Sequence, residues 1–237
     1  MLTLKTDGGT VFVYKNDDLL GTVRLYGNLC HAACCYIEPE LKRYDPEIGK
    51  ELFEELRRMA GRPLQAMVGS ENGEIIGFLE ASGFVCRRKC YETEVCREDY
   101  RGRAEPMELS AVRRGEVLYD TCCRVMYARY LDTHRTINPW TAGYDAFCGF
   151  LPAEAVCEIC DGQVVNLAFV EKNEIAYLWG TPSSRFSRFA ANLVEQLFAK
   201  HGTICFESDD CDWAAMELRQ LFIGQSESSF DTYILGN

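Results

Sequence analysis

The sequence predicts an α/β protein in which two sets of strands and helices follow one another along the chain. Three observations support this fold class. Amphipathic helices directly follow apolar strands, short polar turns separate neighbouring apolar runs, and the order hairpin, strand, helix, strand, helix, strand occurs twice. The length of 237 residues permits one large domain or two small ones.

Composition narrows the class of protein. A hydrophobic fraction of 47% is ordinary for a globular chain with a core. No apolar run reaches membrane-spanning length, and Met1–Asp7 has no signal-peptide hydrophobic region, so we expect a cytoplasmic protein without membrane association. The net charge of −11 disfavours a nucleic-acid surface and favours a cationic partner such as an amine.

The cysteines indicate buried thiols rather than a metal centre. The chain has 13 of them, an odd number, scattered through apolar segments such as Ala33–Tyr36. This distribution is typical of small hydrophobic side chains in a reducing compartment. Cys157-x-x-Cys160 resembles half of a zinc site, but no second pair has suitable spacing. We therefore expect reduced cysteines and no metal.

In the first half, Asp45 is a good N-cap and Pro46 a good first residue for a helix that ends before Gly61. Residues 72–81 favour a short helix, although Asn72-Gly73 could equally open a hairpin. The strands expected in the first half are Val11–Tyr14, Gly21–Leu25, Leu29–Glu38, Leu64–Val68 and a last strand after Gly83-Phe84.

A charged stretch, Arg97–Pro106, predicts a linker between the halves. The strands expected after it are Glu108–Val112, Ala155–Cys160, Val164–Val170, Glu174–Gly180, Thr203–Phe206 and Phe230–Leu235. The helices expected there are Glu116–Leu131, Tyr144–Phe150, one that follows Gly180 and runs to Phe198, and one from about Trp213 to Phe222.

The most informative stretch is the corner after the strand Glu174–Gly180. A polar loop follows, and then a helix whose apolar stripe begins with Phe186, Phe189 and Ala190. A helix N-terminus exposes backbone N–H groups and attracts anions. Because Arg185 and Arg188 flank this corner, we expect its ligand to carry phosphates.

The element order of residues 106–237 resembles the GNAT superfamily of acyl-CoA-dependent N-acetyltransferases. The phosphate loop of that family reads Arg/Gln-x-x-Gly-x-Gly/Ala. Arg185 and Ala190 match it, while Arg188 stands where the first Gly is usual. A later family feature, Asn-x-x-Ala-x-x-Leu-Tyr, resembles the segment from Asp212 to Arg219, with Asp for Asn and Arg for Tyr.

The first half resembles a truncated copy of the same unit. Asn72–Phe84 is similar to the late feature, whereas the loop before the first helix keeps only Gly49. The resemblance implies two GNAT-like units, residues 1–98 and 106–237, each a mixed, largely antiparallel sheet flanked by helices. The first would lack the opening strand and helices. Because Asp45 and Glu47 would repel a pyrophosphate, we expect acetyl-CoA to bind only the second.

The resemblance further implies an N-acetyltransferase that acts on a small-molecule or peptide amine. Glu174 or Glu171 would be the base, and Tyr177 or Tyr233 the acid in place of the usual Tyr. Residues implied to contact the cofactor are Leu178, Trp179, Gly180, Arg185, Phe186, Ser187, Arg188, Phe189, Ala190 and Asp212. The alternative is a catalytically degenerate protein that binds CoA or serves as a scaffold. The sequence does not specify the oligomeric state.

Overall fold

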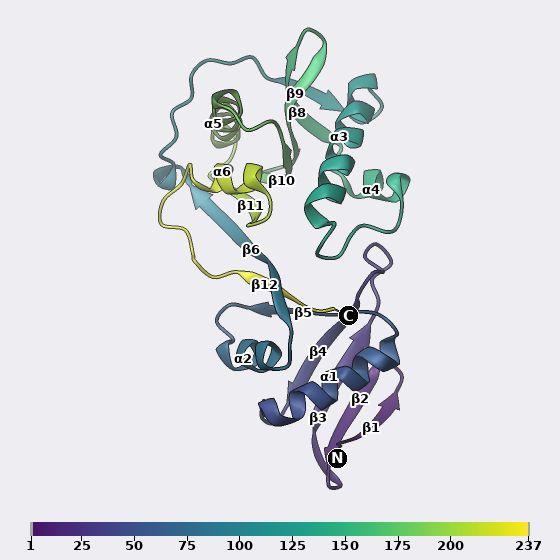
Figure 1. Ribbon diagram of the computed structural model, residues 1–237. Coiled ribbons are helices and arrows are strands. Elements are labelled where there is room, and N and C mark those ends of the chain that lie inside the picture. Colours follow the sequence, from purple (N-terminus) through teal and green to yellow (C-terminus); the bar gives the residue numbers. More distant parts are fainter. Residues whose placement is uncertain (1, 237) are drawn as a thin grey trace. The chain divides into compact units, whose positions relative to one another are not determined.

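The computed structural model describes residues 2–236, which form twelve strands, six α-helices and a short 3-10 helix, Arg97–Asp99. The fold is α+β with a mixed sheet (Figure 1). The chain forms two compact units. Unit 1 comprises the residues up to Lys89, the segment His134–Ala142 and the residues from Ser228 onward. Unit 2 comprises Cys90–Thr133 and Gly143–Glu227.

In unit 1 the pairs β1–β2, β2–β3, β3–β4 and β5–β12 are antiparallel, and the pair β4–β5 is parallel. The strand order of this unit is β1-β2-β3-β4-β5-β12, with the start of β6 next to β12. Positive φ angles at Asn16 and Asp17 close the predicted hairpin between β2 and β3. The strands are β1 (Leu2–Asp7), β2 (Thr10–Lys15), β3 (Asp18–Tyr26), β4 (Cys35–Leu41), β5 (Leu64–Gly69), β6 (Val85–Cys96) and β12 (Phe230–Leu235).

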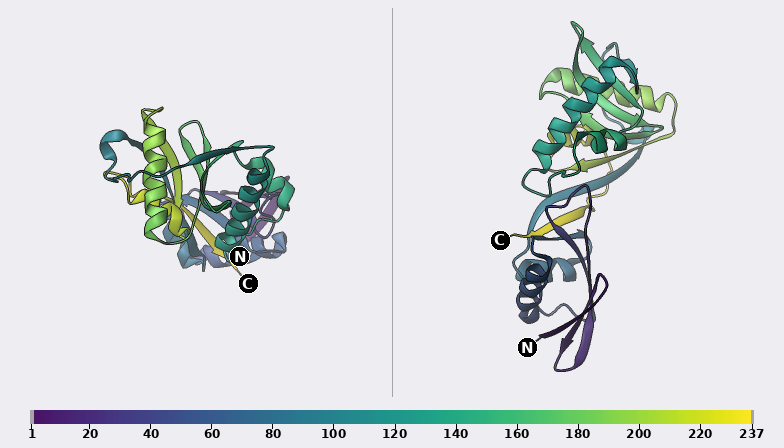
Figure 2. Two further views of the ribbon diagram at one scale, coloured as in Figure 1. Left: turned by 90° about the horizontal axis from the view of Figure 1, so that it is seen from above. Right: turned by 90° about the vertical axis from the view of Figure 1, so that its right-hand side faces the viewer.

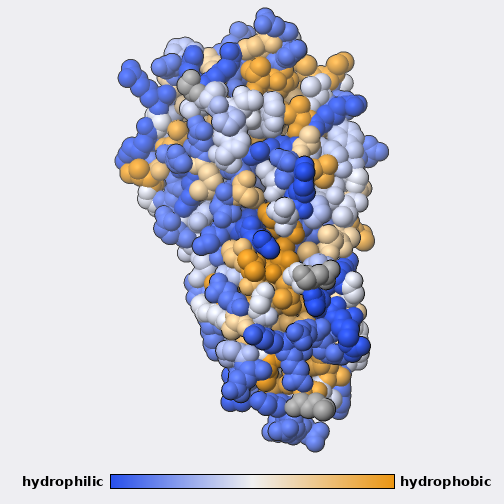
Figure 3. Space-filling view, in the orientation of Figure 1, coloured by the Kyte–Doolittle hydropathy of each residue, from blue (hydrophilic) through white to orange (hydrophobic). Residues whose placement is uncertain are grey.

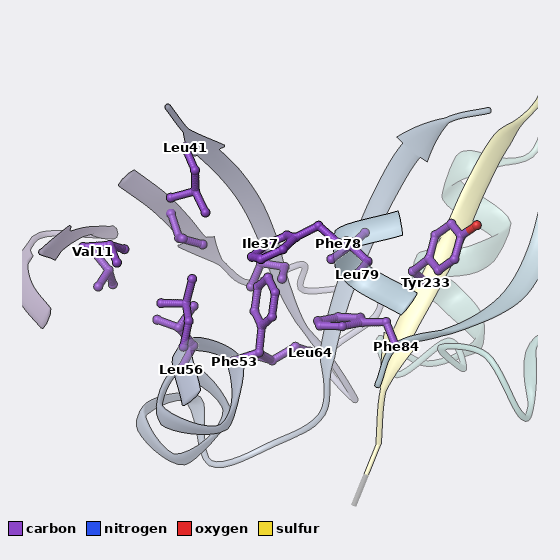
Figure 4. Packing of buried hydrophobic residues seen from close by; sticks show 14 of the residues in the cluster. Val11, Ile37, Leu41, Phe53, Leu56, Leu64, Phe78, Leu79, Phe84 and Tyr233 are labelled. Atoms are coloured by element: carbon purple, nitrogen blue, oxygen red, sulfur yellow. The ribbon is translucent and has the colours of Figure 1, made fainter. Parts of the chain in front are cut away.

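Helices α1 (Pro46–Ala60) and α2 (Gly73–Ala81) form the core of unit 1 with the sheet. The Asp45 side chain accepts a hydrogen bond from the Glu47 backbone N–H at 3.0 Å, so the predicted N-cap is confirmed. Figure 4 shows the packing of residues from these helices against residues from the strands. Ten of the core residues are Val11, Ile37, Leu41, Phe53, Leu56, Leu64, Phe78, Leu79, Phe84 and Tyr233.

A segment from later in the chain packs against other residues of unit 1. In the segment His134–Ala142, Ile137 packs with Cys34 and Ile234. The buried Asn138 donates hydrogen bonds to the Gln65 Oε1 atom at 2.8 Å and the Tyr36 hydroxyl at 3.3 Å. This unit therefore depends on residues that lie beyond the linker in sequence.

Unit 2 has the strand order β7-β8-β9-β10-β11-β6, where β6 contributes Cys90–Cys96. Only the neighbours β10 and β11 are parallel among these strands of the described chain. Helices α3 and α5 lie on opposite faces of this sheet (Figure 2). The elements are β7 (Ser110–Arg113), α3 (Val117–His134), α4 (Tyr144–Phe150), β8 (Glu154–Cys160), β9 (Gln163–Glu171), β10 (Glu174–Trp179), α5 (Ser184–Phe198), β11 (Thr203–Asp209) and α6 (Trp213–Arg219).

Three local predictions need correction or completion. The first half does have an opening strand, β1, which pairs with β2 in antiparallel register. The predicted strand from Leu29 begins only at Cys35, because Leu29 is 92% exposed and the residues between form bends and turns. The segment after Asn72 is helical, which excludes the alternative of a hairpin.

The last strand of each half pairs with the other half. The strand Phe230–Leu235 is confirmed, but β12 pairs with β5 of unit 1, with Thr232 opposite Met67. The second part of β6 pairs with β11 of unit 2, with Glu92 opposite Glu207. The compact units therefore differ from the division into residues 1–98 and 106–237 that the sequence suggests.

Hydrophilic and apolar side chains are interspersed on the face of the molecule shown in Figure 3. Within residues 2–236, no helix combines the length and the hydropathy that a membrane crossing requires.

Candidate active site

The candidate site lies where β10 and β11 separate. These parallel strands pair through Glu174 with Cys205 and through Ile175 with Phe206, and their ladder has no further pairs among the described residues. The register of β10 against β9 also shifts between Ile175 and Tyr177. The later β10 residues therefore have no strand partner on the β11 side among the described residues, and we call this interruption of the pairing the gap.

Helix α5 begins directly after this gap. Ser183 is the extended N-cap residue, and the first turn of the helix contains no acidic residue. Phe186, Phe189 and Ala190 are fully buried, and the Phe186 ring lies 4.7 Å from that of Trp213. These three predicted cofactor residues therefore position the helix with their side chains. The Phe186 backbone N–H already donates to the Ser183 carbonyl oxygen at 3.0 Å, and those of Phe189 and Ala190 lie past the first turn, where N–H groups bond within the helix.

Gly180 permits close packing at the same corner. A Cβ atom on this residue would overlap the Asn166 Oδ1 atom and the Phe186 ring. Glycine is therefore required by space at this position. Leu178, two residues earlier, is buried in the unit 2 core, so its side chain is not exposed to a ligand.

Arg185 and Arg188 line one cavity of about 360 Å³, together with Met107, Glu108, Glu158, Ile159 and Cys160. The Arg185 Nε atom lies 2.5 Å from the Glu158 Oε1 atom, and its guanidinium also contacts the Cys160 thiol. Arg188 pairs with Glu105 at 3.2 Å and donates to the Pro106 carbonyl oxygen at 3.3 Å. The cavity brings both predicted arginines together, but each already has a carboxylate partner.

These carboxylates were not found by sequence reasoning. The loop after Gly180 contains no acid, and Glu158 and Glu105 lie 27 and 83 residues away in sequence from the arginines that they contact. No local spacing in the sequence signals either pair. The positive potential at this corner is consequently lower than the loop alone predicts.

The remaining predicted cofactor residues make structural contacts. Ser187 donates a hydrogen bond to the Glu217 carboxylate. Asp212 caps α6 by accepting from the Ala214 backbone N–H at 3.0 Å, and it pairs with Arg129 at 2.7 Å. Trp179 is half-buried at the end of β10.

Solved structures resemble this chain, whereas no family model and no curated protein matches its sequence. A GCN5-related N-acetyltransferase from Sphaerobacter thermophilus is 11% identical with a TM-score of 0.52, covering 96% of this chain and 80% of that one. One from Kribbella flavida is 16% identical with a TM-score of 0.51, covering 100% and 90%. A GNAT-family acetyltransferase from Colwellia psychrerythraea is 10% identical with a TM-score of 0.52, covering 95% and 85%. The chain has the GNAT fold.

Acidic side chains line a second cavity of unit 2, of about 400 Å³, beside the paired ends of β10 and β11. Glu92 lies directly opposite Glu207 on neighbouring strands, an arrangement of like charges that destabilises a sheet. The residues around this cavity are Glu92, Thr93, Glu94, Glu174, Cys205, Phe206 and Glu207. We call it the acidic cleft.

Of the two predicted catalytic residues, Glu174 lines this cleft, whereas Tyr177 packs among aromatic rings. Glu174 is exposed at the start of β10 and lines the cleft. The Tyr177 ring lies 6.0 Å from that of Phe147 and 6.4 Å from that of Tyr130. Burial raises the pKa of the Tyr177 hydroxyl, and the charges of Glu207 and Glu174 raise it further. Tyr177 is therefore protonated at neutral pH and can act as a hydrogen-bond donor.

The other residues considered for catalysis lie in different surroundings. Glu171 pairs with Glu174 across the turn between β9 and β10. Tyr233 belongs to the core of unit 1. Arg219, at the position of the family's Tyr, is only 8% exposed, and it donates to the Ser226 carbonyl oxygen at 2.8 Å.

The corresponding corner of unit 1 has a different chemistry. Strands β4 and β5 also pair over two residues only in the described chain, and α1 follows β4. Here, however, Asp45 caps the helix itself. A Cβ atom on Gly49 would overlap the Ser82 hydroxyl and lie 2.8 Å from the Phe78 ring. Gly49, the one residue kept from the phosphate-loop pattern, therefore serves the packing of α1 against α2.

The cysteines have separate environments. The sulfur atoms of Cys157 and Cys122 are 3.5 Å apart, whereas the Cys160 thiol contacts Arg185 and Glu158. All 13 cysteines are free thiols in the structure. Among residues 2–236, no cluster of three or more His, Cys, Asp and Glu side chains has the arrangement of a metal site.

Proposed function

We propose that unit 2 is an N-acetyltransferase that moves the acetyl group of acetyl-CoA to an amine. The observation that carries this proposal is the gap between β10 and β11, which opens directly before the N-terminus of α5 in a GNAT fold. A strand backbone and a helix N-terminus that meet in this way can bind an extended ligand ending in phosphates.

The cavity beside α5 fits the phosphate end of the cofactor. The Arg185 and Arg188 side chains line it and are 52% and 44% exposed, so their free N–H groups can reach a ligand. Acetyl-CoA supplies an activated acetyl thioester when it is bound. Because the N–H groups of successive strand residues point to alternate edges, those of the segment Leu178–Gly180 that face away from β9 would polarise a carbonyl oxygen in the gap.

The acidic cleft fits the acceptor. An aliphatic amine is a cation at neutral pH, and the carboxylates of Glu92, Glu94 and Glu207 attract it. Glu174 accepts the proton that the amine must lose before it attacks. Tyr177, whose raised pKa keeps its proton, donates to the leaving sulfur. The acceptor class is a small-molecule or peptide amine, preferably one with more than one positive charge.

The experiment has two steps. Calorimetry with acetyl-CoA and CoA tests binding, and mass spectrometry of a panel of amines incubated with protein and acetyl-CoA tests transfer. We expect binding together with acetylation of di- or polycationic amines in preference to neutral ones. Absence of binding at millimolar acetyl-CoA would reject the proposal.

A second candidate function is CoA binding without transfer, in a sensor or scaffold. The contacts of Arg219 favour it, because this residue fills the position of the usual Tyr and is tied to Ser226 and Thr93. Binding of acetyl-CoA without turnover of any amine would support this second function over the first.

A further inference from the structure

Glu158 is a buried charged residue at a strand position where an apolar side chain would suffice for packing. It lies on β8, is 4% exposed and sits two residues after Val156 of the unit 2 core. Its Oε1 atom accepts from the Arg185 Nε atom at 2.5 Å, and its Oε2 atom accepts from the Asn166 Nδ2 atom at 2.6 Å. Because a buried carboxylate is costly to desolvate, a pair of this kind adds little net stability over an apolar residue.

Asn166 completes the arrangement. It is 2% exposed, and its Oδ1 atom has no hydrogen-bond partner among the described residues. That atom lies close to Gly180, since a Cβ at 180 would overlap it. The polar chain Asn166–Glu158–Arg185 therefore runs from beneath the end of β10 to the wall of the cavity at the start of α5.

The pairing constrains how Arg185 meets a ligand. With Nε bonded to Glu158, the guanidinium cannot swing freely, although the side chain is 52% exposed. A long arginine side chain otherwise loses rotamer entropy when it binds an anion. A guanidinium that is already held in place forms its remaining N–H bonds to a phosphate at a smaller entropic cost.

We propose that Glu158 is a positioning residue, which holds Arg185 in the orientation that binds the phosphate groups of the ligand. This inference rests on the proposed function for the identity of that ligand. The positioning role predicts that removal of Glu158 weakens anion binding. If Glu158 only competed with the anion for Arg185, its removal would strengthen that binding.

Two variants separate the possibilities. Glu158→Gln keeps an oxygen for Arg185 Nε, and its amide can donate to Asn166 Oδ1 after the Asn166 side chain flips. Glu158→Leu keeps the approximate volume and removes both acceptors. Glu154→Gln is the matched control, because Glu154 lies on the same strand and pairs with Arg113 at 3.3 Å, outside the cavity.

The first measurement is NMR of the arginine Nε–H groups without ligand. We expect an ordered Arg185 signal in the wild type, Glu158→Gln and Glu154→Gln, and an averaged one in Glu158→Leu. The second is calorimetry with inorganic pyrophosphate and with CoA. We expect affinities within about threefold of wild type for Glu158→Gln and about tenfold weaker for Glu158→Leu.

The outcomes are distinguishable. Tighter binding by both Glu158 variants would show competition and overturn the proposal. Unchanged affinity in a folded Glu158→Leu protein would also overturn it. In a third outcome, the wild type binds pyrophosphate but not CoA, and Glu158→Leu loses the binding of pyrophosphate. The proposed function then fails while the positioning role stands.

Discussion

The guanidinium of Arg219 lies over the ring of Tyr91, 4.4 Å from its centroid. The same group donates to the Ser226 carbonyl oxygen at 2.8 Å and to the Thr93 hydroxyl at 3.5 Å, and Arg219 is only 8% exposed. These contacts join α6 to β6 and to the segment after α6. Arg219 is thus a structural residue at the position where GNAT-like sequences usually carry a Tyr.

Replacing Arg219 should therefore affect stability first. We expect Arg219→Leu to lower the free energy of unfolding by about 2–3 kcal/mol, because it removes a buried cation–π contact and charged hydrogen bonds. Urea unfolding measures this change. Arg58→Leu is the control, since Arg58 forms an exposed pair with Glu55, and pairs of this kind contribute little to stability. A loss of activity with unchanged stability would instead indicate a role in catalysis.

Two glycines should respond in opposite directions to the same substitution. Gly180→Ala should lower the free energy of unfolding by about 1–3 kcal/mol, because its Cβ would overlap Asn166 and Phe186. Gly77→Ala should raise it by about 0.5–1 kcal/mol, since Gly77 is exposed inside α2 with open space around it. Thermal unfolding of both variants checks the two signs. A stable Gly180→Ala protein would contradict the packing at this corner.

The structure also predicts destabilisation at alkaline pH. Burial raises the pKa of Tyr119 to about 12, and its hydroxyl donates to the Pro152 carbonyl oxygen at 2.6 Å. Because the folded pKa lies above the unfolded value near 10, the stability from this group is complete below pH 10. It is lost as the pH rises toward 12. Tyr119→Phe should flatten the fall of stability in this range, and equal slopes for variant and wild type would argue against it.

The sequence predicted those features that depend on neighbouring residues. The cap at Asp45, the hairpins and the helix after Gly180 follow from turn chemistry and from apolar spacing, and they are confirmed. The opening strand β1 was missed, although the exposures of Leu2 and Leu4 alternate with those of their neighbours. Only Leu2 and Leu4 are apolar in this stretch, and Lys5, Thr6 and Asp7 follow without alternation, so the pattern is too short to predict a strand.

Features that depend on residues far apart in the chain could not be predicted from the sequence. The alternating pattern of β12 predicts a strand but not that β5 is its partner. The loop arginines predict an anion site, but their carboxylate partners Glu158 and Glu105 come from other elements. For the same reason Gly49 matched a phosphate-loop pattern, whereas its environment is a helix–helix contact.

One molecule of CoA should bind per chain. Arg185→Glu should weaken that binding by about 1–3 kcal/mol, because it removes a charge-assisted hydrogen bond. Reversing the charges of Asp45 and Glu47 in unit 1 should leave the affinity nearly unchanged. It should still lower stability by about 1 kcal/mol, since Asp45 caps α1. Calorimetric titration gives both the stoichiometry and the affinities, and two sites per chain would contradict the assignment of the cofactor to unit 2 alone.

Neither half of the chain should fold alone. A fragment of residues 1–98 lacks β12, which pairs with β5, and it lacks Ile137 and Asn138, which pack against Cys34 and Gln65. Without β12, one edge of β5 has open backbone groups, and such an exposed edge favours aggregation. A fragment of residues 106–237 likewise lacks β6 beside β11. Circular dichroism of each fragment, with the full chain as the control, should show no cooperative thermal unfolding. Cooperative unfolding of residues 1–98 alone would mean that the strands contributed by the other half are dispensable.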